Sequence, residues 1–119
     1  MLKIKRLIKS FTYAFRGLAK VAHEEQNFRL ELIAAAVVLT LSFIIGLAYW
    51  EIALLIIVIG LVLIMEIVNS AVEAISDVLK PKLDDYVKRI KDMTAAGVMT
   101  ASLAALLVGC LIFGHYLLG

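Results

Sequence analysis

Residues 52–65 read IALLIIVIGLVLIM, and residues 66–77 continue without a break as EIVNSAVEAISD. The first part holds no charge, whereas the second part brings in acidic and polar side chains at three- and four-residue spacing. About 20 apolar residues, at about 1.5 Å of helical rise each, are needed to cross a hydrocarbon core about 30 Å thick. The segment therefore predicts one long helix that spans a membrane and carries acids in its second half.

Two further segments have the same apolar character. Residues 32–50 contain no charged side chain, and residues 93–119 contain no Lys, Arg, Asp or Glu. We therefore predict an all-α integral membrane protein that forms a single domain over residues 1–119. Its transmembrane helices are expected near 31–48, 51–79 and 93–118.

The composition excludes an ordinary soluble enzyme and a disordered chain. Of the 119 residues, 63% are hydrophobic and 18% are charged, whereas a soluble domain is about 45–50% apolar and about 25% charged. The single cysteine, Cys110, excludes an internal disulfide and a Cys-rich metal site. The net charge of +2 indicates no nucleic-acid partner.

The basic residues predict how the chain crosses the membrane. All twelve lie in residues 1–29 or between Lys80 and Lys91, and segments rich in Lys and Arg stay on the cytoplasmic side. We therefore expect the N-terminus inside the cell and the C-terminus outside. Residues 80–92, which begin next to Pro81 and include Asp84 and Asp85, are expected to form a basic cytoplasmic loop.

Residues 1–29 predict a cytoplasmic helix that lies in the membrane interface. Apolar residues recur there every three or four positions, and basic residues occupy the other side, as is typical of an amphipathic surface helix. A solvated basic flank with no other role is the alternative. The apolar positions are Ile4, Leu7, Ile8, Phe11, Phe15 and Leu18.

The polar residues of 66–77 form one stripe on the second predicted transmembrane helix. At about 100° per residue, they lie between about −60° and +40° from Glu66. An acid within a membrane is costly unless it is paired, protonated or hydrated, so it marks a functional site by default. The stripe could serve a metal ion, a proton pathway or phosphate chemistry; a polar packing contact is the alternative. Its members are Glu66, Asn69, Ser70, Glu73 and Asp77.

Two other polar groups are placed to meet this stripe at one membrane level. Glu24 and Glu25 precede the first apolar segment, and Lys91-Asp92 precede the third. Carboxylates such as Glu25 suit Mg²⁺, which often binds through one or two carboxylates plus substrate phosphates. The sequence contains no GxxxxGK[ST] loop and no protein-kinase motif, so any nucleotide chemistry would use another arrangement.

Three motifs resemble those of the prokaryotic diacylglycerol kinase family. Residues 66–73, EIVNSAVE, are similar to its E-x-x-N-[ST]-A-[IV]-E signature, and residues 89–93, RIKDM, resemble its second signature, with Ile90 where Ala is more usual. Glu25-x-x-Phe28-Arg29 matches upstream. The resemblance covers nearly the whole chain, and the combination of motifs is more specific than any one of them.

The resemblance implies an ATP- and Mg²⁺-dependent lipid kinase of the bacterial cytoplasmic (inner) membrane. Members are homotrimers with three transmembrane helices and an N-terminal surface helix per subunit, and their active sites lie at subunit interfaces near the cytoplasmic surface. The acceptor implied is diacylglycerol, which becomes phosphatidic acid; undecaprenol, the acceptor of a Gram-positive branch, is the alternative.

The resemblance also implies a role for each matching residue. Glu66 would be the catalytic base, and Glu25 and Glu73 would hold Mg²⁺. The lipid substrate would meet Arg6, Glu31 and Glu66. The nucleotide would meet Arg6, Arg16, Glu25, Asn69, Glu73, Asp77, Lys91 and Asp92.

Small residues in the third predicted helix favour close helix packing. Gly97, Ala101, Ala105 and Gly109 recur every four residues, a spacing that lets helices approach. This face could serve a trimer or packing within one subunit. Two other function classes stay open: a small cation-coupled transporter explains the intramembrane acids but not Lys91-Asp92, and a structural assembly protein leaves the acids without purpose.

Overall fold

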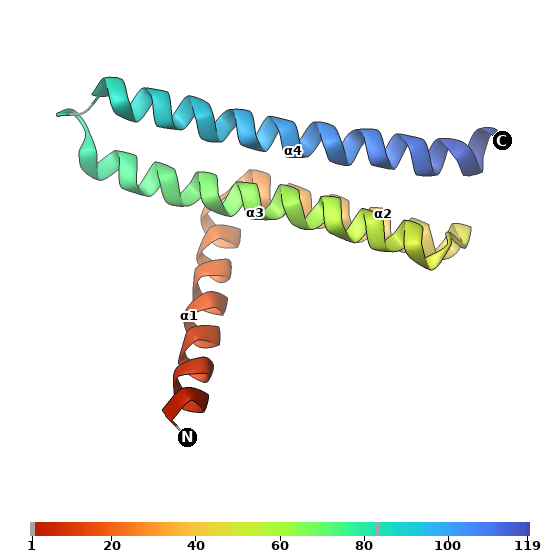
Figure 1. Cartoon of the computed structure of the whole chain (residues 1–119), viewed down its shortest axis with the longest axis horizontal. Helices are drawn as coiled ribbons and strands as arrows, with labels where there is room; N and C mark the ends of the chain where they lie inside the picture. The colour runs from red at the N-terminus through yellow and green to blue at the C-terminus, as the bar shows by residue number, and fades with distance from the viewer. Residues whose placement is uncertain (1, 83) are drawn as a thin grey trace.

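The computed structural model describes residues 2–82 and 84–119, and this part of the chain forms four helices (Figure 1). They are α1 (Leu2–Glu24), α2 (Gln26–Ile45), α3 (Tyr49–Leu79) and α4 (Asp84–Leu118). The all-α prediction is confirmed. Helices α2, α3 and α4 are each long and apolar enough to cross a membrane, so the chain is a multi-pass membrane protein by length and composition. Where each helix enters the hydrocarbon stays a prediction.

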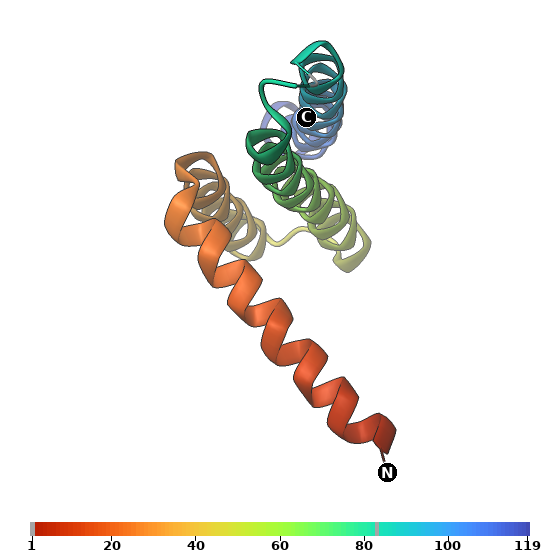
Figure 2. The ribbon, with the colours of Figure 1, turned by 90° about the vertical axis from the view of Figure 1, so that its left-hand side faces the viewer.

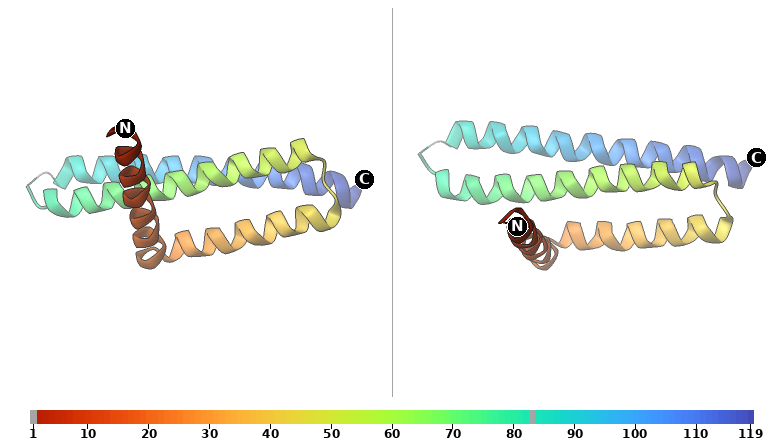
Figure 3. Two further views of the ribbon diagram at one scale, coloured as in Figure 1. Left: turned by 90° about the horizontal axis from the view of Figure 1, so that it is seen from below. Right: turned by 60° about the horizontal axis from the view of Figure 1, so that its bottom comes forward.

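Helix α3 lies in the middle of a row of three. The end-on view of Figure 2 shows α2 on one side of α3 and α4 on the other. Helices α3 and α4 form a long antiparallel hairpin, and α2 runs beside α3 (Figure 3). Helix α1 joins the first residue of α2 through Glu25 and runs at a steep angle to the other three helices (Figure 1). The helix with the polar stripe therefore has neighbours on both sides.

The turn between α2 and α3 is set by glycine and glutamate. Gly46 ends α2 with φ +83°, a left-handed conformation that glycine adopts without a steric penalty, and its N–H donates to the Ser42 carbonyl. Glu51 then accepts the Ala48 N–H at 2.9 Å and so caps the start of α3. These caps reverse the chain within a few residues.

The predicted loop over 80–92 is wrong for most of its length. Helix α3 ends at Leu79 and α4 begins at Asp84, so Lys91 and Asp92 lie two turns inside a helix. Charged residues do not stop a helix outside a membrane, and Asp84 and Asp85 favour its first turn because acids complement the positive end of the helix dipole. Helix α4 therefore reaches well beyond its predicted membrane span.

Most large apolar side chains face outward. A small buried cluster of Leu47, Leu55 and Ile112 holds the helices together at the end where the α2–α3 turn lies. Elsewhere the apolar surface is exposed, as expected where lipid covers it. The apolar side chains of α1 are also exposed. The interfacial position of α1 and the trimer stay predictions.

Candidate active site

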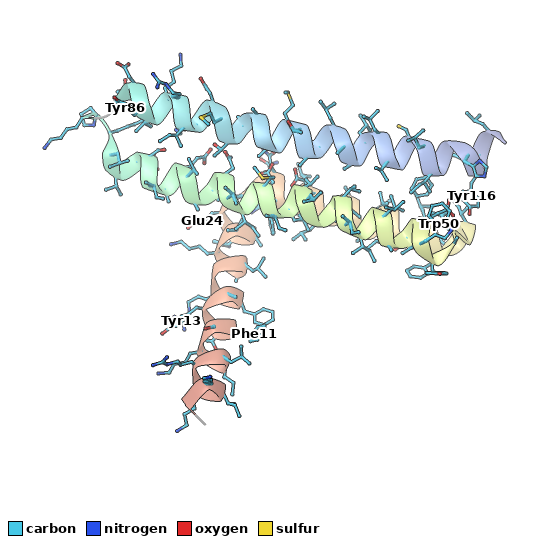
Figure 4. All side chains as sticks on the ribbon, viewed as in Figure 1. Phe11, Tyr13, Glu24, Trp50, Tyr86 and Tyr116 are labelled. Atoms are coloured by element: carbon cyan, nitrogen blue, oxygen red, sulfur yellow. The ribbon has the colours of Figure 1, made fainter. Side chains whose placement is uncertain are left out.

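Glu25 occupies the bend between α1 and α2. It is the single residue between these helices, with φ −106° and ψ 110°. From the first turn of α2, Arg29 reaches back, and its Nη1 donates to the carbonyls of Ala22 at 2.9 Å and His23 at 2.7 Å. Phe28 beside it is 2% exposed. Figure 4, which labels the neighbouring Glu24, shows this bend partway along the length of α3.

A hydrogen bond connects this bend to the polar stripe. The Ser70 hydroxyl on α3 donates to Glu25 Oε1 at 2.8 Å, although the two residues are 45 positions apart in the sequence. Next to Ser70 on α3, Asn69 Nδ2 donates to Oε1 of Glu73, which lies one turn further along the helix, at 3.5 Å. The structure therefore brings Glu25 to the stripe, whereas Glu24 is exposed.

A second pair of acids joins α2 to α3. Glu66 is 7% exposed, and its carboxyl group lies close to that of Glu31 on α2. Glu31 Oε2 is buried and has no hydrogen-bond partner among the described residues. Polar groups buried without partners are rare and point to a ligand or a role in the chemistry. Glu31 and Glu66 thus form the innermost part of the site.

An apolar groove of about 500 Å³ starts at Glu31. It runs from Glu31 between α2, α3 and α4 toward the α2–α3 turn, and its walls are almost wholly apolar. Beyond Glu31, its lining is Ala34, Ala35 and Val38 of α2, Leu55, Val58, Ile59, Val62 and Leu63 of α3, and Ser102, Ala105, Leu106, Gly109, Cys110 and Phe113 of α4. Its shape suits a hydrocarbon chain with a polar end at the acids.

The register of the hairpin places Lys91 and Asp92 near the same level. Gly97 of α4 packs so closely on Met65 of α3 that a Cβ there would collide with the Met65 Cε methyl. Lys91 and Asp92 lie about 8–9 Å before Gly97 at about 1.5 Å per residue. Because the helices are antiparallel, this is the level of Ser70.

The remaining predicted residues lie farther out. Asp77 follows Glu73 by one turn of α3. Arg16 lies about 14 Å and Arg6 about 28 Å from Glu25 along α1, at about 1.5 Å per residue. Arg16 stacks over the Tyr13 ring at 5.7 Å. Helix α1 runs away from the other three helices toward the N-terminus (Figure 1), and among the described residues no hydrogen bond joins either arginine to an acid.

Sequence reasoning missed two residues that shape the site. The sequence places Ser70 on the polar stripe and Arg29 in a motif, and it indicates no role for either. The spacing places Ser70 on the helix face of Glu66, four residues away, but no spacing indicates that Ser70 meets Glu25 or that Arg29 reaches back to α1.

The donor set fits a cation that arrives with a substrate. Among residues 2–82 and 84–119, no three His, Cys, Asp or Glu side chains gather as a complete metal site. Mg²⁺ commonly takes one or two protein carboxylates together with substrate phosphates and water. Glu25 is bonded to Ser70 of α3, and Glu73 follows Ser70 by one turn of the same helix. These two carboxylates would supply such a partial set.

The fold and the site define a class: a helical membrane protein with a cluster of acids at the polar end of an apolar groove. Comparison with known proteins gives the family. Residues 12–113 match the prokaryotic diacylglycerol kinase family model. The chain belongs to the prokaryotic diacylglycerol kinase family, as the motifs predict, and it is a lipid kinase.

Individual relatives support this family and carry two different names. A Bacillus subtilis protein named undecaprenol kinase is 32% identical over 111 residues, 93% of this chain and 90% of that protein. An Escherichia coli K12 protein named diacylglycerol kinase is 32% identical over 112 residues, 93% of this chain and 92% of that one. A Helicobacter pylori diacylglycerol kinase is 33% identical over 114 residues, 96% of this chain and 86% of that one.

Proposed function

We propose that the protein transfers the γ-phosphate of ATP to diacylglycerol in a Mg²⁺-dependent reaction that yields phosphatidic acid. One observation supports this above all: Glu31 forms the polar end of the apolar groove and lies close to Glu66 of α3, and Ser70 of the same helix holds Glu25 by a hydrogen bond. A lipid could keep its chains in the groove while its hydroxyl group reaches the acids.

The transfer needs a base and a means of neutralising phosphate charge. The lipid hydroxyl oxygen forms a bond to the γ-phosphorus, the bond from that phosphorus to the β–γ bridging oxygen breaks, and ADP leaves. Glu66 takes the hydroxyl proton, a contribution of about 10²–10⁴-fold for a general base. Glu31, in contact with Glu66, binds the acceptor beside it. The rest of the catalysis is positioning and electrostatic stabilisation.

The nucleotide would bind on the cytoplasmic side of this pair. Glu25 and Glu73 would hold Mg²⁺, which neutralises phosphate charge when bound. Lys91 lies at the level of Ser70, where its ammonium group could balance the phosphates. Asn69, Asp77, Asp92, Arg6 and Arg16 complete the proposed nucleotide contacts, and Arg6 also contacts the lipid.

Undecaprenol is the second candidate acceptor. The relative named undecaprenol kinase is as similar to this chain as the E. coli relative named diacylglycerol kinase, with 32% identity to each. The groove offers almost no polar side chain beyond Glu31, so its walls suit an isoprenoid chain as well as an acyl chain.

A lipid panel tests both acceptors. The purified protein is incubated with Mg²⁺, radiolabelled ATP and either diacylglycerol or undecaprenol at equal mole fractions in mixed micelles. We expect labelled phosphatidic acid as the faster product. Faster labelling of undecaprenol would replace the proposed acceptor, and no labelled lipid from either would contradict both.

We also propose how the protein sits in its membrane. Homotrimers with α1 on the cytoplasmic surface, the N-terminus inside and the C-terminus outside, would place the acids close to cytoplasmic ATP in the bacterial inner membrane. The basic residues at both ends of the α3–α4 connection and on α1 support this orientation.

A further inference from the structure

We propose that Ser70 and Arg29 are positioning residues that together fix the carboxylate of Glu25 for its metal. This inference rests on the proposed role of Glu25 in holding Mg²⁺. Neither side chain needs to touch the nucleotide or the lipid. Each acts on Glu25 from a different element: Ser70 from α3, and Arg29 from α2 through the end of α1.

Arg29 fixes the bend between α1 and α2 at which Glu25 lies. The last carbonyls of a helix have no partner within that helix, and a cation there also complements the helix dipole. Arg29 Nη1 donates to two of these carbonyls, those of Ala22 and His23. Because α2 carries Arg29 and α1 carries the carbonyls, these bonds set the angle between the helices. Glu25, the single residue between them, is placed by that angle.

Ser70 fixes the direction in which the Glu25 carboxylate points. Its hydroxyl donates to Oε1 at 2.8 Å, so Oε2 is the oxygen that stays available for a cation. Ser70 lies one turn before Glu73 on α3, so its bond turns Glu25 toward the neighbourhood of the other proposed metal ligand. Partners of this kind commonly change metal affinity by about 10–100-fold when they are removed.

A packing role for Ser70 and Arg29 makes different predictions. Packing residues would change the thermal stability and leave the metal affinity of the folded protein unaltered. Positioning residues would change the metal affinity, and added metal would restore turnover. The measurement must therefore follow cation binding directly, as well as activity.

The test measures Mn²⁺ binding by electron paramagnetic resonance to the full-length protein in lipid nanodiscs, with a non-hydrolysable ATP analogue present. For Ser70→Ala we expect the Mn²⁺ dissociation constant to rise about 10-fold, with kcat largely restored at high Mg²⁺. Ser70→Thr keeps a hydroxyl group and should bind Mn²⁺ close to the parent protein. Thr100→Ala is the matched control, because Thr100 donates to Ala96 within exposed α4.

For Arg29, the variants Arg29→Gln and Arg29→Lys are compared. Arg29→Gln should weaken Mn²⁺ binding as Ser70→Ala does, and Arg29→Lys should weaken it less, because lysine keeps a cationic donor near the carbonyls. If Arg29→Gln does not fold, Arg29→Lys still gives the comparison: Mn²⁺ binding equal to that of the parent would count against the role of Arg29.

Glu25→Gln separates this inference from the proposed metal site. If Glu25→Gln weakens Mn²⁺ binding and Ser70→Ala does not, the metal role of Glu25 stands and the positioning role of Ser70 is refuted. If Glu25→Gln binds Mn²⁺ like the parent protein, the proposed metal role itself fails. Weaker binding in both variants, with Thr100→Ala unchanged, supports the two together.

Discussion

Glu66 is a single residue whose chemistry depends on its surroundings. It is almost fully buried and lies close to Glu31 of the neighbouring helix, which forms the polar end of the apolar groove. A carboxylate in this position does not stabilise the fold, because burying an acid costs free energy unless something compensates for it. A proton acceptor for a lipid hydroxyl is the role that this placement supports.

Glu66→Gln should therefore lower kcat by about 10²–10⁴-fold, since an amide of the same shape cannot accept the proton. The assembly and its thermal stability should change little. ATP-dependent lipid labelling at saturating substrate measures the effect. Glu24→Gln, an exposed acid beside the site, is the control and should keep parental activity. Full labelling by Glu66→Gln would exclude Glu66 as the base.

Gly97 shows how a missing side chain sets the register of two helices. A Cβ at this position would collide with the Met65 Cε methyl, whereas a Cβ at Gly114 on the same helix would meet nothing within 4 Å. Overfilling a packed contact costs about 1–3 kcal/mol. We expect Gly97→Ala to be less stable than Gly114→Ala by about 1 kcal/mol, at the low end because methionine is flexible. Unfolding in the same detergent measures both, and equal midpoints would contradict the contact.

At the scale of the elements, the ends of α3 and α4 are joined by a polar contact. The Tyr116 hydroxyl donates to Glu51 Oε1, and the same oxygen accepts the Ala48 N–H that caps α3. Glu51 is 5% exposed. Figure 4 labels Trp50 and Tyr116, which lie together at this end of the bundle. The contact fastens the last turns of α4 to the α2–α3 turn, about 22 Å from Glu66 at about 1.5 Å per residue.

Tyr116→Phe should therefore destabilise the protein by about 1.5 kcal/mol, because it removes one hydrogen bond to a carboxylate. Turnover should be unchanged, because the acids lie at the other end of α3. Tyr49→Phe is the matched control, since Tyr49 lies at the same end and is 86% exposed. Thermal unfolding and lipid phosphorylation are measured together. Equal unfolding midpoints for the two variants would show that the contact contributes nothing.

The sequence predicts the helices well and their contacts less well. Apolar runs identify α2, α3 and α4 because a membrane helix needs a long uncharged segment, and the spacing from Glu66 to Asp77 identifies the polar stripe. The start of α4 at Asp84 is not predicted, because a search for long uncharged segments does not detect the charged helical turns that precede such a segment.

The hydrogen bond between Ser70 and Glu25 shows which part of the site the sequence does not predict. It joins residues 45 positions apart, and no local pattern states which hydroxyl of one helix meets which acid of another. The same holds for the contact of Glu31 with Glu66. Such contacts depend on how α2 and α3 pack, which the pattern within each helix leaves open.

At the scale of the whole molecule, the direction of α1 bears on the proposed trimer. Figure 1 shows α1 running away from the row of α2, α3 and α4, and Arg6 lies about 28 Å from Glu25 along α1 at about 1.5 Å per residue. The apolar side of α1 and the outer faces of the other helices are exposed. In the proposed trimer, Arg6 would reach the site of a neighbouring subunit.

Mixing two inactive variants tests this arrangement. Arg6→Ala and Glu66→Gln subunits, co-assembled in equal amounts, should recover about one quarter of parental activity, because random assembly leaves about one site in four with both residues intact. Glu66→Gln mixed with Glu73→Ala is the control: both residues lie on one α3, so no recovery is expected. Absence of recovery in the first mixture would show that Arg6 does not serve another subunit's site.

The crossing of α1 with the other helices has a consequence for the enzyme's rate law. If α1 lies in the membrane interface, as we propose, the acids near Glu25 would lie at the depth of the lipid headgroups and the groove would open among the acyl chains. The substrate then never leaves the bilayer, and encounters are two-dimensional. Turnover should follow the mole fraction of acceptor lipid in the membrane, so that diluting the acceptor with inert lipid slows the enzyme, while adding more vesicles of the same composition does not change its saturation.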